Sequence, residues 1–235
     1  MPAAVYRRRG EIEVVEIDTP VPEGDQVLVE VDYCGICGTD LHMVLDGWGS
    51  PDTVFGHEWS GRVIEPGGSG LARGTTVVGG PAPTCGVCVH CQANRPSLCT
   101  GRSDAGDGPE LGAYTRYITR APDHLVAVPA GIDQRAAAYT EPLAVALHAV
   151  TNAAVHTGQR ALVFGGGPIG AAITAILVGR GIEVTVAEPG ERRRALAERL
   201  GARAVAPDDL DVPSHPGRTT ADAAHVVFES SGARA

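Results

Sequence analysis

The sequence predicts an α/β protein that begins with a β-rich domain and continues into a parallel sheet. Two observations predict this order. Short β-type runs separated by turn residues fill the first half, and a strand, a glycine-rich turn and a helix follow from residue 160. All six cysteines lie in the first half of the chain. The two halves are therefore expected to differ in both architecture and chemistry.

The β-rich segment extends from residue 3 to residue 129. It is rich in Gly, Pro and Val, and β-type runs occur at residues 26–31, 61–64, 75–78 and 125–128. Because turn residues separate these runs at short intervals, we expect a β core with long loops. Residues 141–155 have an Ala/Leu/Val periodicity without internal glycine, which predicts a helix leading out of this domain.

The second half alternates strands and helices. The apolar run ALVF is followed by GGGPIG and an apolar helix, then by the strand IEVTVA and the helix ERRRALAERLGA. Further strands are predicted at residues 204–205 and 225–229. This βαβα order implies a parallel sheet with right-handed crossovers. We therefore expect two domains, residues 1–150 and 151–235, of which the second is an incomplete doubly wound sheet.

Composition limits the classes of function. Hydrophobic residues make up 43% and charged residues 20% of the chain, enough apolar side chain for a core. The formal net charge of −9 argues against nucleic acid or an anionic membrane as a partner. The sequence shows neither a secretory signal nor an apolar run of the roughly 18 residues that a transmembrane helix needs. We expect a cytoplasmic protein with a small-molecule partner.

Four cysteines form one compact motif. Cys85, Cys88, Cys91 and Cys99 have the spacing CxxCxxCx7C within the loop formed by residues 81–100. Four thiolates complete a tetrahedral zinc site with no open position, so this site would be structural. An iron–sulfur cluster, buried free thiols and a disulfide pair are the alternatives, although the bacterial ferredoxin run has a different spacing.

A different set of metal-binding residue types precedes this loop. The segment CGICGTDLH contains Cys37, and GHEWSG contains His57 and Glu58. A cysteine, a histidine and a nearby carboxylate form the ligand set of a catalytic zinc, which keeps its fourth position for water or substrate. We treat Cys34 as a small buried residue, because one thiolate is enough for such a site.

A glycine fingerprint follows the strand ALVF. Gly165, Gly167 and Gly170 satisfy GxGxxG at the start of a helix, the context in which this motif binds the pyrophosphate of a dinucleotide. Glu188 ends the next strand, where an acid accepts hydrogen bonds from the adenosine ribose and repels a 2′-phosphate. This favours NAD over NADP. The arginines at 192–194 favour NADP, unless they form a solvated helix face.

Together these motifs resemble one family. CGICGTDLH, GHEWSG, the four-cysteine loop, EPLAVALHA and GxGxxG occur in the order found in zinc-dependent medium-chain alcohol dehydrogenases. Within that family the chain resembles the polyol, butanediol and threonine dehydrogenase branch. The resemblance implies a GroES-like β-barrel catalytic domain followed by a partial Rossmann domain. It also implies two zinc ions per chain and hydride transfer between an alcohol, or its ketone or aldehyde, and NAD(P).

The resemblance also implies roles for residues of the first metal site. Cys37 and His57 resemble zinc ligands of the family, and either Glu58 or Glu141 would supply the third ligand. The sequence does not choose between these two glutamates. Asp40 resembles the carboxylate that orients the zinc-bound histidine.

Three more residues take roles from the same resemblance. Thr39 resembles the hydroxyl that accepts the alcohol proton, and His42 the histidine that passes this proton to solvent, a task suited to an unperturbed pKa of about 6.5. Arg193 resembles a basic residue that contacts the cofactor ribose.

The chain ends at the fourth predicted strand of the second domain, in HVVFESSGARA. It therefore resembles a family member whose C-terminal end is missing. The family forms homo-oligomers, but this expectation is weaker for the shorter chain. The alternative function is a truncated or degenerate zinc-binding protein without hydride chemistry. The sequence does not indicate which alcohol or polyol is the substrate.

Overall fold

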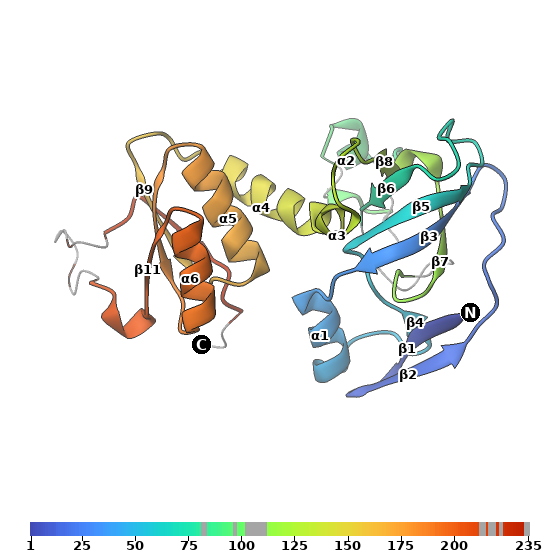
Figure 1. Ribbon diagram of the computed structural model, residues 1–235, viewed down its shortest axis with the longest axis horizontal. Coiled ribbons are helices and arrows are strands. Elements are labelled where there is room, and N and C mark those ends of the chain that lie inside the picture. Colours follow the sequence, from blue (N-terminus) through green and yellow to red (C-terminus); the bar gives the residue numbers. More distant parts are fainter. Residues whose placement is uncertain are drawn as a thin grey trace. The chain divides into compact units, whose positions relative to one another are not determined.

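The computed structural model describes residues 1–80, 84–95, 98–101, 112–211, 215, 220 and 223–232. Two compact units divide the chain, Met1–Glu141 and Pro142–Ala235. The division falls inside helix α4 (Thr140–Ala153; Figure 1), whereas the sequence predicts a boundary after residue 150. Residues 81–83 and 96–97 of the expected zinc loop lie outside the described residues.

The first unit contains two antiparallel sheets. The smaller sheet has three strands in the order β2-β1-β4, and the larger has five in the order β7-β3-β5-β6-β8 (Figure 1). The small sheet consists of β1 (Pro2–Arg8), β2 (Glu11–Glu16) and β4 (Thr53–Val54). The large sheet consists of β3 (Val27–Cys34), β5 (Trp59–Glu65), β6 (Thr76–Gly79), β7 (Tyr117–Arg120) and β8 (Leu125–Ala127).

Alternate residues of the large sheet form the core of this unit. Val27 and Val29 of β3 are fully buried, and Val29 lies opposite Val63 of β5 and Ile118 of β7. β-Branched side chains suit such a pleated surface because they pack against cross-strand neighbours. The β core expected from the sequence is therefore confirmed, and it aligns the end of β3 with the start of β5.

Helical segments connect the strands of the first unit. They are α1 (Gly38–Asp46), α2 (Val89–Gln92), α3 (Gln134–Ala137) and the 3-10 turn η2 (Pro122–His124). The sequence predicts long loops between these strands rather than helices. Helix α1 has nine residues and buries only Asp40, so no apolar face reveals it in the sequence.

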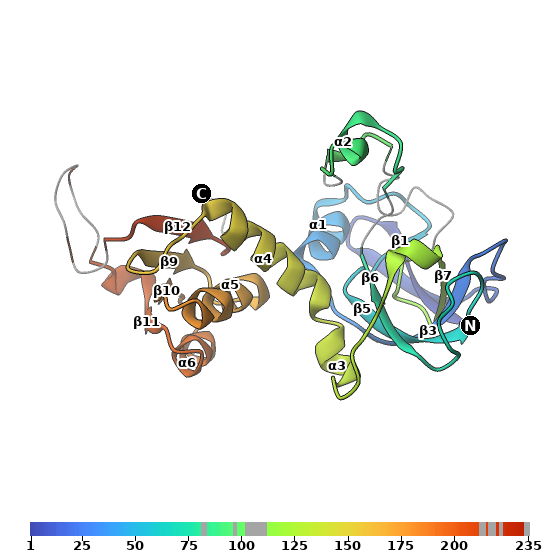
Figure 2. The same cartoon turned by 90° about the horizontal axis from the view of Figure 1, so that it is seen from above.

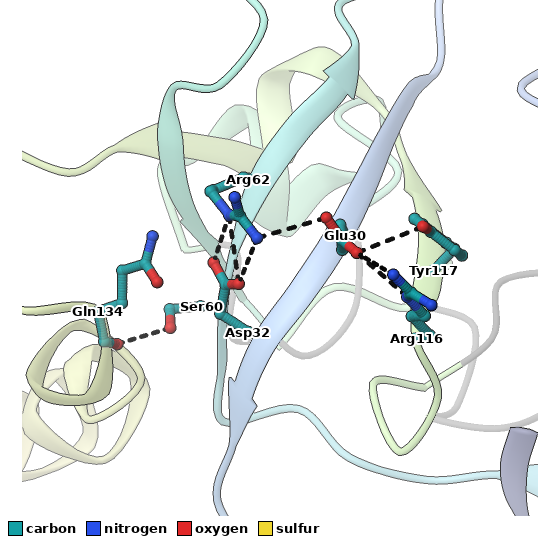
Figure 3. Close-up of polar contacts among 7 residues, drawn as sticks. All are labelled: Glu30, Asp32, Ser60, Arg62, Arg116, Tyr117 and Gln134. Carbon is teal, nitrogen blue, oxygen red and sulfur yellow. Dashed lines mark hydrogen bonds and ion pairs between the residues drawn. The ribbon is translucent and has the colours of Figure 1, made fainter.

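A charged network covers one face of the large sheet (Figure 3). Arg62 of β5 donates to both carboxylate oxygens of Asp32 on β3, at 3.0–3.2 Å, and to Glu30 at 3.4 Å. Glu30 also accepts from Arg116 at 3.0 and 3.1 Å and from the Tyr117 hydroxyl at 3.3 Å. The network joins β3 to both of its neighbouring strands.

The second unit is a parallel sheet with the strand order β11-β10-β9-β12 (Figure 2). In chain order its elements are β9 (Arg160–Phe164), α5 (Pro168–Gly179), β10 (Glu183–Ala187), α6 (Glu191–Arg199), β11 (Arg203–Val205), the 3-10 turn η3 (Pro207–Asp209) and β12 (Val226–Glu229). The predicted alternation of strands and helices, with a Rossmann-like parallel sheet, is confirmed.

One apolar core holds this unit together. Buried side chains of the strands, such as Val163 and Val186, pack with Leu177 of α5 and with Ala146 and Val150 of α4. This packing fixes the glycine-rich turn between β9 and α5, at the carboxyl end of the sheet. Within the described part of the chain, no helix is long and apolar enough to cross a membrane.

Candidate functional site

Helix α1 starts from the second cysteine of CGIC. Cys37 is the N-cap residue: its sulfur accepts a hydrogen bond from the Thr39 amide at 3.5 Å, and its own amide donates to the Asp40 carboxylate at 3.0 Å. This reciprocal pair of hydrogen bonds is a capping box, with a thiol in place of the usual hydroxyl. The cap fixes the backbone that carries both the Cys37 thiol and the Asp40 carboxylate.

Three possible metal ligands gather beside this cap. The Cys37 sulfur, a ring nitrogen of His57 and a carboxylate oxygen of Glu58 lie within 4.8 Å of one another. The Gly35 amide donates to the Glu58 carbonyl at 2.7 Å. A Cβ atom at Gly35 would lie 2.3 Å from Glu58 Oε2, so a larger residue there would push this carboxylate out of its present position. The donor set is one that zinc accepts with a fourth position open.

The surroundings of His57 favour positive charge. The hydrogen bond with Cys37 raises the pKa of His57 to about 9, and the charge of Asp40 acts in the same direction. Asp40 Oδ1 lies 3.6 Å from His57 Nδ1, and its residue is only 4% exposed. A cation at this place, whether a proton on the ring or a metal ion, is therefore stabilised by the nearby anions.

Glu141 lies close to the same group, at the start of α4. Burial raises the pKa of Glu141, the charge of His57 lowers it, and Glu58 and Asp40 raise it further. The group of donor atoms that lie within 4.8 Å of one another includes no oxygen of Glu141. The structure thus brings Glu58 together with Cys37 and His57, while Glu141 interacts with them through charge.

The two residues expected to move a proton lie on α1. Thr39 and His42 are both exposed. His42 Nδ1 lies 2.9 Å from Asp46 Oδ2, one helical turn further on. Sequence reasoning missed Asp46, although the spacing of four residues on a helix could have indicated it.

Tyr114 also contacts this site and was not singled out from the sequence. Its hydroxyl lies 2.7 Å from Asp40 Oδ2 and 3.0 Å from the Gly35 carbonyl oxygen. No local sequence signal marks it, because residues 112–114 reach the site by pairing with residues 54–56. Cys34 lies outside the donor group, and burial raises the pKa of its thiol to about 12. That environment suits the packing role expected for Cys34.

The four-cysteine motif forms a second donor group. The sulfur atoms of Cys85, Cys88, Cys91 and Cys99 lie within 4.8 Å of one another. Backbone amides point at them: the Cys85 amide donates to Cys99 at 3.3 Å, and the Cys88 amide to Cys85 at 3.4 Å. Hydrogen bonds from the Cys91 and Thr100 amides lower the pKa of Cys88 to about 5. Sulfur atoms that accept amide hydrogen bonds are suited to the thiolate form that zinc binds.

Each glycine of the fingerprint has a distinct environment. Gly165 has φ +91°, a left-handed conformation that glycine adopts without strain. Gly167 is the N-cap of α5. A Cβ atom at Gly170 would lie 1.9 Å from the Gly165 carbonyl oxygen, so α5 can approach the turn only with glycine there. The amides at the start of α5 form the kind of turn that accepts a phosphate.

Glu188 closes this turn from the end of β10. Glu188 is 3% exposed. Its two carboxylate oxygens accept hydrogen bonds from the amides of Gly166 and Gly190, each at 2.7 Å. The exposed Arg193 lies 3.8 Å from the same carboxylate. The sequence predicts that Glu188 lies beside the glycine-rich turn, and in the structure its carboxylate contacts this turn and Arg193.

Comparisons with known proteins agree with these features. A model described as the alcohol dehydrogenase GroES-like domain matches residues 23–130. The chain is 38% identical to 2-dehydro-3-deoxy-L-galactonate 5-dehydrogenase of Pseudoalteromonas atlantica, covering 98% of this chain and 69% of that protein. It is 33% identical to sorbitol dehydrogenase of Halalkalibacterium halodurans, covering 95% and 67%. A zinc-binding dehydrogenase from Sinorhizobium meliloti, solved bound to NADP, has a TM-score of 0.87 at 31% identity, covering 99% and 70%.

The GroES-like unit with its donor groups and the dinucleotide-type turn define the class of metal-dependent oxidoreductases that use a nicotinamide cofactor. The chain belongs to the zinc-type alcohol dehydrogenase family. It spans 69% and 67% of the length of the two curated relatives. Because these relatives are dehydrogenases of small polyhydroxylated molecules, the comparisons support an alcohol oxidoreductase over the non-catalytic alternative.

Proposed function

We propose that the chain oxidises a secondary hydroxyl group of a polyol or sugar acid and transfers the hydride to NAD, with ketone reduction as the reverse reaction. The β-rich domain would hold the metal centres, and the parallel sheet would hold the dinucleotide. The observation that carries the proposal is the group formed by Cys37, His57 and Glu58. Relatives named for a sugar acid and for sorbitol support a polyhydroxylated substrate.

The same proposal assigns a role to each residue of the metal centre. When bound, zinc supplies Lewis acidity toward an alcohol oxygen, and a nicotinamide dinucleotide accepts the hydride. Cys37, His57 and Glu58 hold the zinc; Glu58 is preferred to Glu141 because its oxygen lies within 4.8 Å of the other two donors. Asp40 orients the His57 ring through Nδ1, which leaves Nε2 for the metal. The four-cysteine group holds the second, structural zinc.

Proton movement is assigned to α1. Thr39 accepts the substrate proton through its hydroxyl, and His42 passes it to solvent. The contact of His42 Nδ1 with Asp46 at 2.9 Å supports this assignment, because it favours the tautomer whose Nε2 can accept a proton. Both residues are exposed, as a relay to water requires.

We propose NAD rather than NADP as the preferred cofactor. Gly165, Gly167 and Gly170 would form the pyrophosphate turn, and Arg193 would contact the ribose. The buried carboxylate of Glu188 supports the preference, since a fixed negative charge beside the ribose repels a 2′-phosphate. Its hydrogen bonds with two backbone amides hold that charge in place.

The expected setting is a reducing cytoplasm, with homo-oligomers in the family. None of the six cysteines, all of them among the described residues, forms a disulfide, which suits that compartment. The net charge of −9 supports a small-molecule substrate rather than nucleic acid or a membrane surface.

Counting zinc by native mass spectrometry tests the metal centre. We expect two zinc ions per chain, and one in Cys37→Ser. Cys34→Ser is the matched control, because Cys34 lies three residues earlier and outside the donor group; it should keep both ions. A single zinc that Cys37→Ser leaves unchanged would contradict the proposal.

Steady-state kinetics test the reaction and the cofactor. Sorbitol and a C6 sugar acid should each be assayed as substrate with NAD and with NADP, following the absorbance of the reduced nicotinamide. We expect activity that depends on zinc and is greater with NAD. A chain that retains two zinc ions yet reduces neither cofactor with any polyhydroxylated substrate would support the non-catalytic alternative.

A further inference from the structure

Asp40 stands between the helix cap and the metal centre, and its two oxygens face different partners. Oδ2 accepts the Cys37 amide at 3.0 Å and lies 2.7 Å from the Tyr114 hydroxyl. Oδ1 faces His57 Nδ1 at 3.6 Å. The direction of Oδ1 toward the ring therefore depends on what holds Oδ2.

The Tyr114 hydroxyl has one proton and two acceptors within reach. The Asp40 carboxylate is the nearer, at 2.7 Å, and the Gly35 carbonyl lies at 3.0 Å. Hydrogen bonds to a charged acceptor are shorter and stronger than those between neutral groups. The bond to Asp40 therefore dominates, and it raises the pKa of Tyr114 together with the larger effect of burial.

The position of Tyr114 is fixed independently of its hydroxyl. Its amide donates to the Phe55 carbonyl, and its carbonyl accepts the Ala4 amide, both at 2.9 Å. The ring packs on Gly56, where an added Cβ atom would lie 2.8 Å from Tyr114 Cδ1. Gly56 directly precedes His57, so the Tyr114 ring packs on the residue before one ligand, and its hydroxyl bonds the carboxylate that faces the ring of that ligand.

We propose that Tyr114 is a positioning residue of the catalytic metal centre, whose hydroxyl holds the Asp40 carboxylate so that Oδ1 aligns His57 for metal binding. This inference rests on the proposed function in one respect, namely that the group around Cys37 and His57 binds zinc. It adds a residue outside the motifs on which that function was assigned. Groups that orient a metal-bound histidine commonly change metal affinity by about 10–100-fold when they are removed.

Tyr114→Phe tests the inference because it removes only the hydroxyl and keeps the ring on Gly56. Tyr117→Phe is the matched control: it removes a tyrosine hydroxyl of the same unit, which bonds Glu30 at 3.3 Å in the charged network of Figure 3. The affinity of each full chain for zinc would be measured by chelator competition. The visible spectrum of the cobalt-substituted chain would report the geometry at the metal.

We expect Tyr114→Phe to weaken zinc binding at the catalytic centre by roughly 10–100-fold and to shift the cobalt bands. The four-cysteine site should keep its zinc, and Tyr117→Phe should match the wild type. Unchanged affinity and spectrum in Tyr114→Phe would overturn the inference while leaving the proposed function intact. A wild-type chain that binds zinc only at the four cysteines would overturn both.

A double-mutant cycle with Asp40→Asn separates positioning from a general loss of folding. If Tyr114 acts through Asp40, Tyr114→Phe should weaken zinc binding little further once Asp40 is changed. Fully additive losses in the two variants would mean that Tyr114 supports the fold rather than the carboxylate, and the inference would be wrong.

Discussion

The Cys37 amide donates to the Asp40 carboxylate at 3.0 Å, so one residue pair both caps helix α1 and belongs to the proposed metal centre. Asp40→Ala removes this cap acceptor and leaves the Tyr114 hydroxyl without its charged partner. A lost cap costs about 1 kcal/mol, and a lost hydrogen bond to a charged group costs about 1.5–3 kcal/mol, although the Tyr114 hydroxyl can still donate to the Gly35 carbonyl. We therefore expect denaturant unfolding of Asp40→Ala to show a loss of about 2–4 kcal/mol.

Asp46→Ala is the control for this measurement. Asp46 lies at the C-terminal end of the same helix, where a carboxylate interacts unfavourably with the helix dipole, although it also pairs with His42. Its removal should change the free energy of unfolding by less than about 0.5 kcal/mol. Equal losses in the two variants would mean that the cap contributes nothing specific.

The four-cysteine loop should depend on its metal. Cys88→Ser removes one of the four proposed ligands, so the chain should retain one zinc and become sensitive to proteolysis next to the remaining cysteines. His90→Ala is a matched control, because His90 lies on α2 among the cysteines but outside the donor group. The count of zinc by native mass spectrometry should stay at two in His90→Ala. Loss of zinc in that variant would show that the histidine is a ligand after all.

Local patterns in the sequence predict one part of this molecule well. GxGxxG follows a strand and starts a helix, so the turn formed by Gly165, Gly167 and Gly170 is predictable from neighbouring residues alone. The strands β3, β5, β6 and β8 of the first unit and the four strands of the second follow from apolar alternation or apolar runs for the same reason, whereas β1, β2, β4 and β7 were not predicted. Such features depend on the order of neighbouring residues, so they can be predicted without knowing which distant segments pack together.

The proposed metal centre is less predictable because distant segments build it. The sequence offers two glutamates as the third ligand, and the pairing of β3 with β5, continued by the bond from the Gly35 amide to the Glu58 carbonyl, brings Glu58 near Cys37. Tyr114 reaches Asp40 from a segment that pairs with residues 54–56, a relation that no local motif encodes. Helix α1 was missed because its start is a thiol cap and its buried residue is an acid rather than an apolar face.

The network around Glu30 should make stability depend on pH in the acid range. The hydrogen bond from Arg116 is the largest effect that lowers the pKa of Glu30 below its ordinary 4.5. A depressed folded-state pKa contributes stability that is present above pH 4.5 and is lost as pH falls through the lower folded value. Denaturant unfolding between pH 7 and pH 3 should therefore show a smaller acid loss in Glu30→Gln.

Glu65→Gln serves as the comparison for Glu30→Gln. Glu65 is exposed at the end of β5. Its substitution by glutamine removes the same charge as Glu30→Gln without changing the network. If both variants lost stability with acid to the same extent, the network would have no measurable effect on folding. The expected difference is small, because exposed ion pairs contribute little.

Two glycines of the fingerprint should respond differently to alanine. At Gly170 a Cβ atom would lie 1.9 Å from the Gly165 carbonyl oxygen, whereas at Gly167 no atom lies within 4 Å. Overpacking of this kind costs about 1–3 kcal/mol or more of folding stability, so Gly170→Ala should unfold at a lower denaturant concentration than the wild type. Gly167→Ala should keep wild-type stability but bind NADH more weakly, because its methyl group stands where the pyrophosphate approaches. A Gly167→Ala chain with unchanged NADH affinity would contradict this role.

Glu188 should set both the order of the dinucleotide turn and the choice of cofactor. Its carboxylate accepts two amides, those of Gly166 and Gly190, at 2.7 Å each. Glutamine has one acceptor oxygen, so Glu188→Gln leaves one of these amides facing an NH2 group, at a cost of about 1–3 kcal/mol. NADH should therefore bind more weakly.

The same substitution removes the negative charge that disfavours a 2′-phosphate, so NADPH should lose less affinity than NADH or gain some. Fluorescence titration of both nucleotides gives the ratio of the two Kd values, which should move toward NADPH. Glu191→Gln is the control. Glu191 is exposed in the first turn of α6, and its substitution removes an equal charge three residues after Glu188. A ratio that changes equally in both variants would mean that overall charge, rather than the fixed Glu188 carboxylate, selects the cofactor.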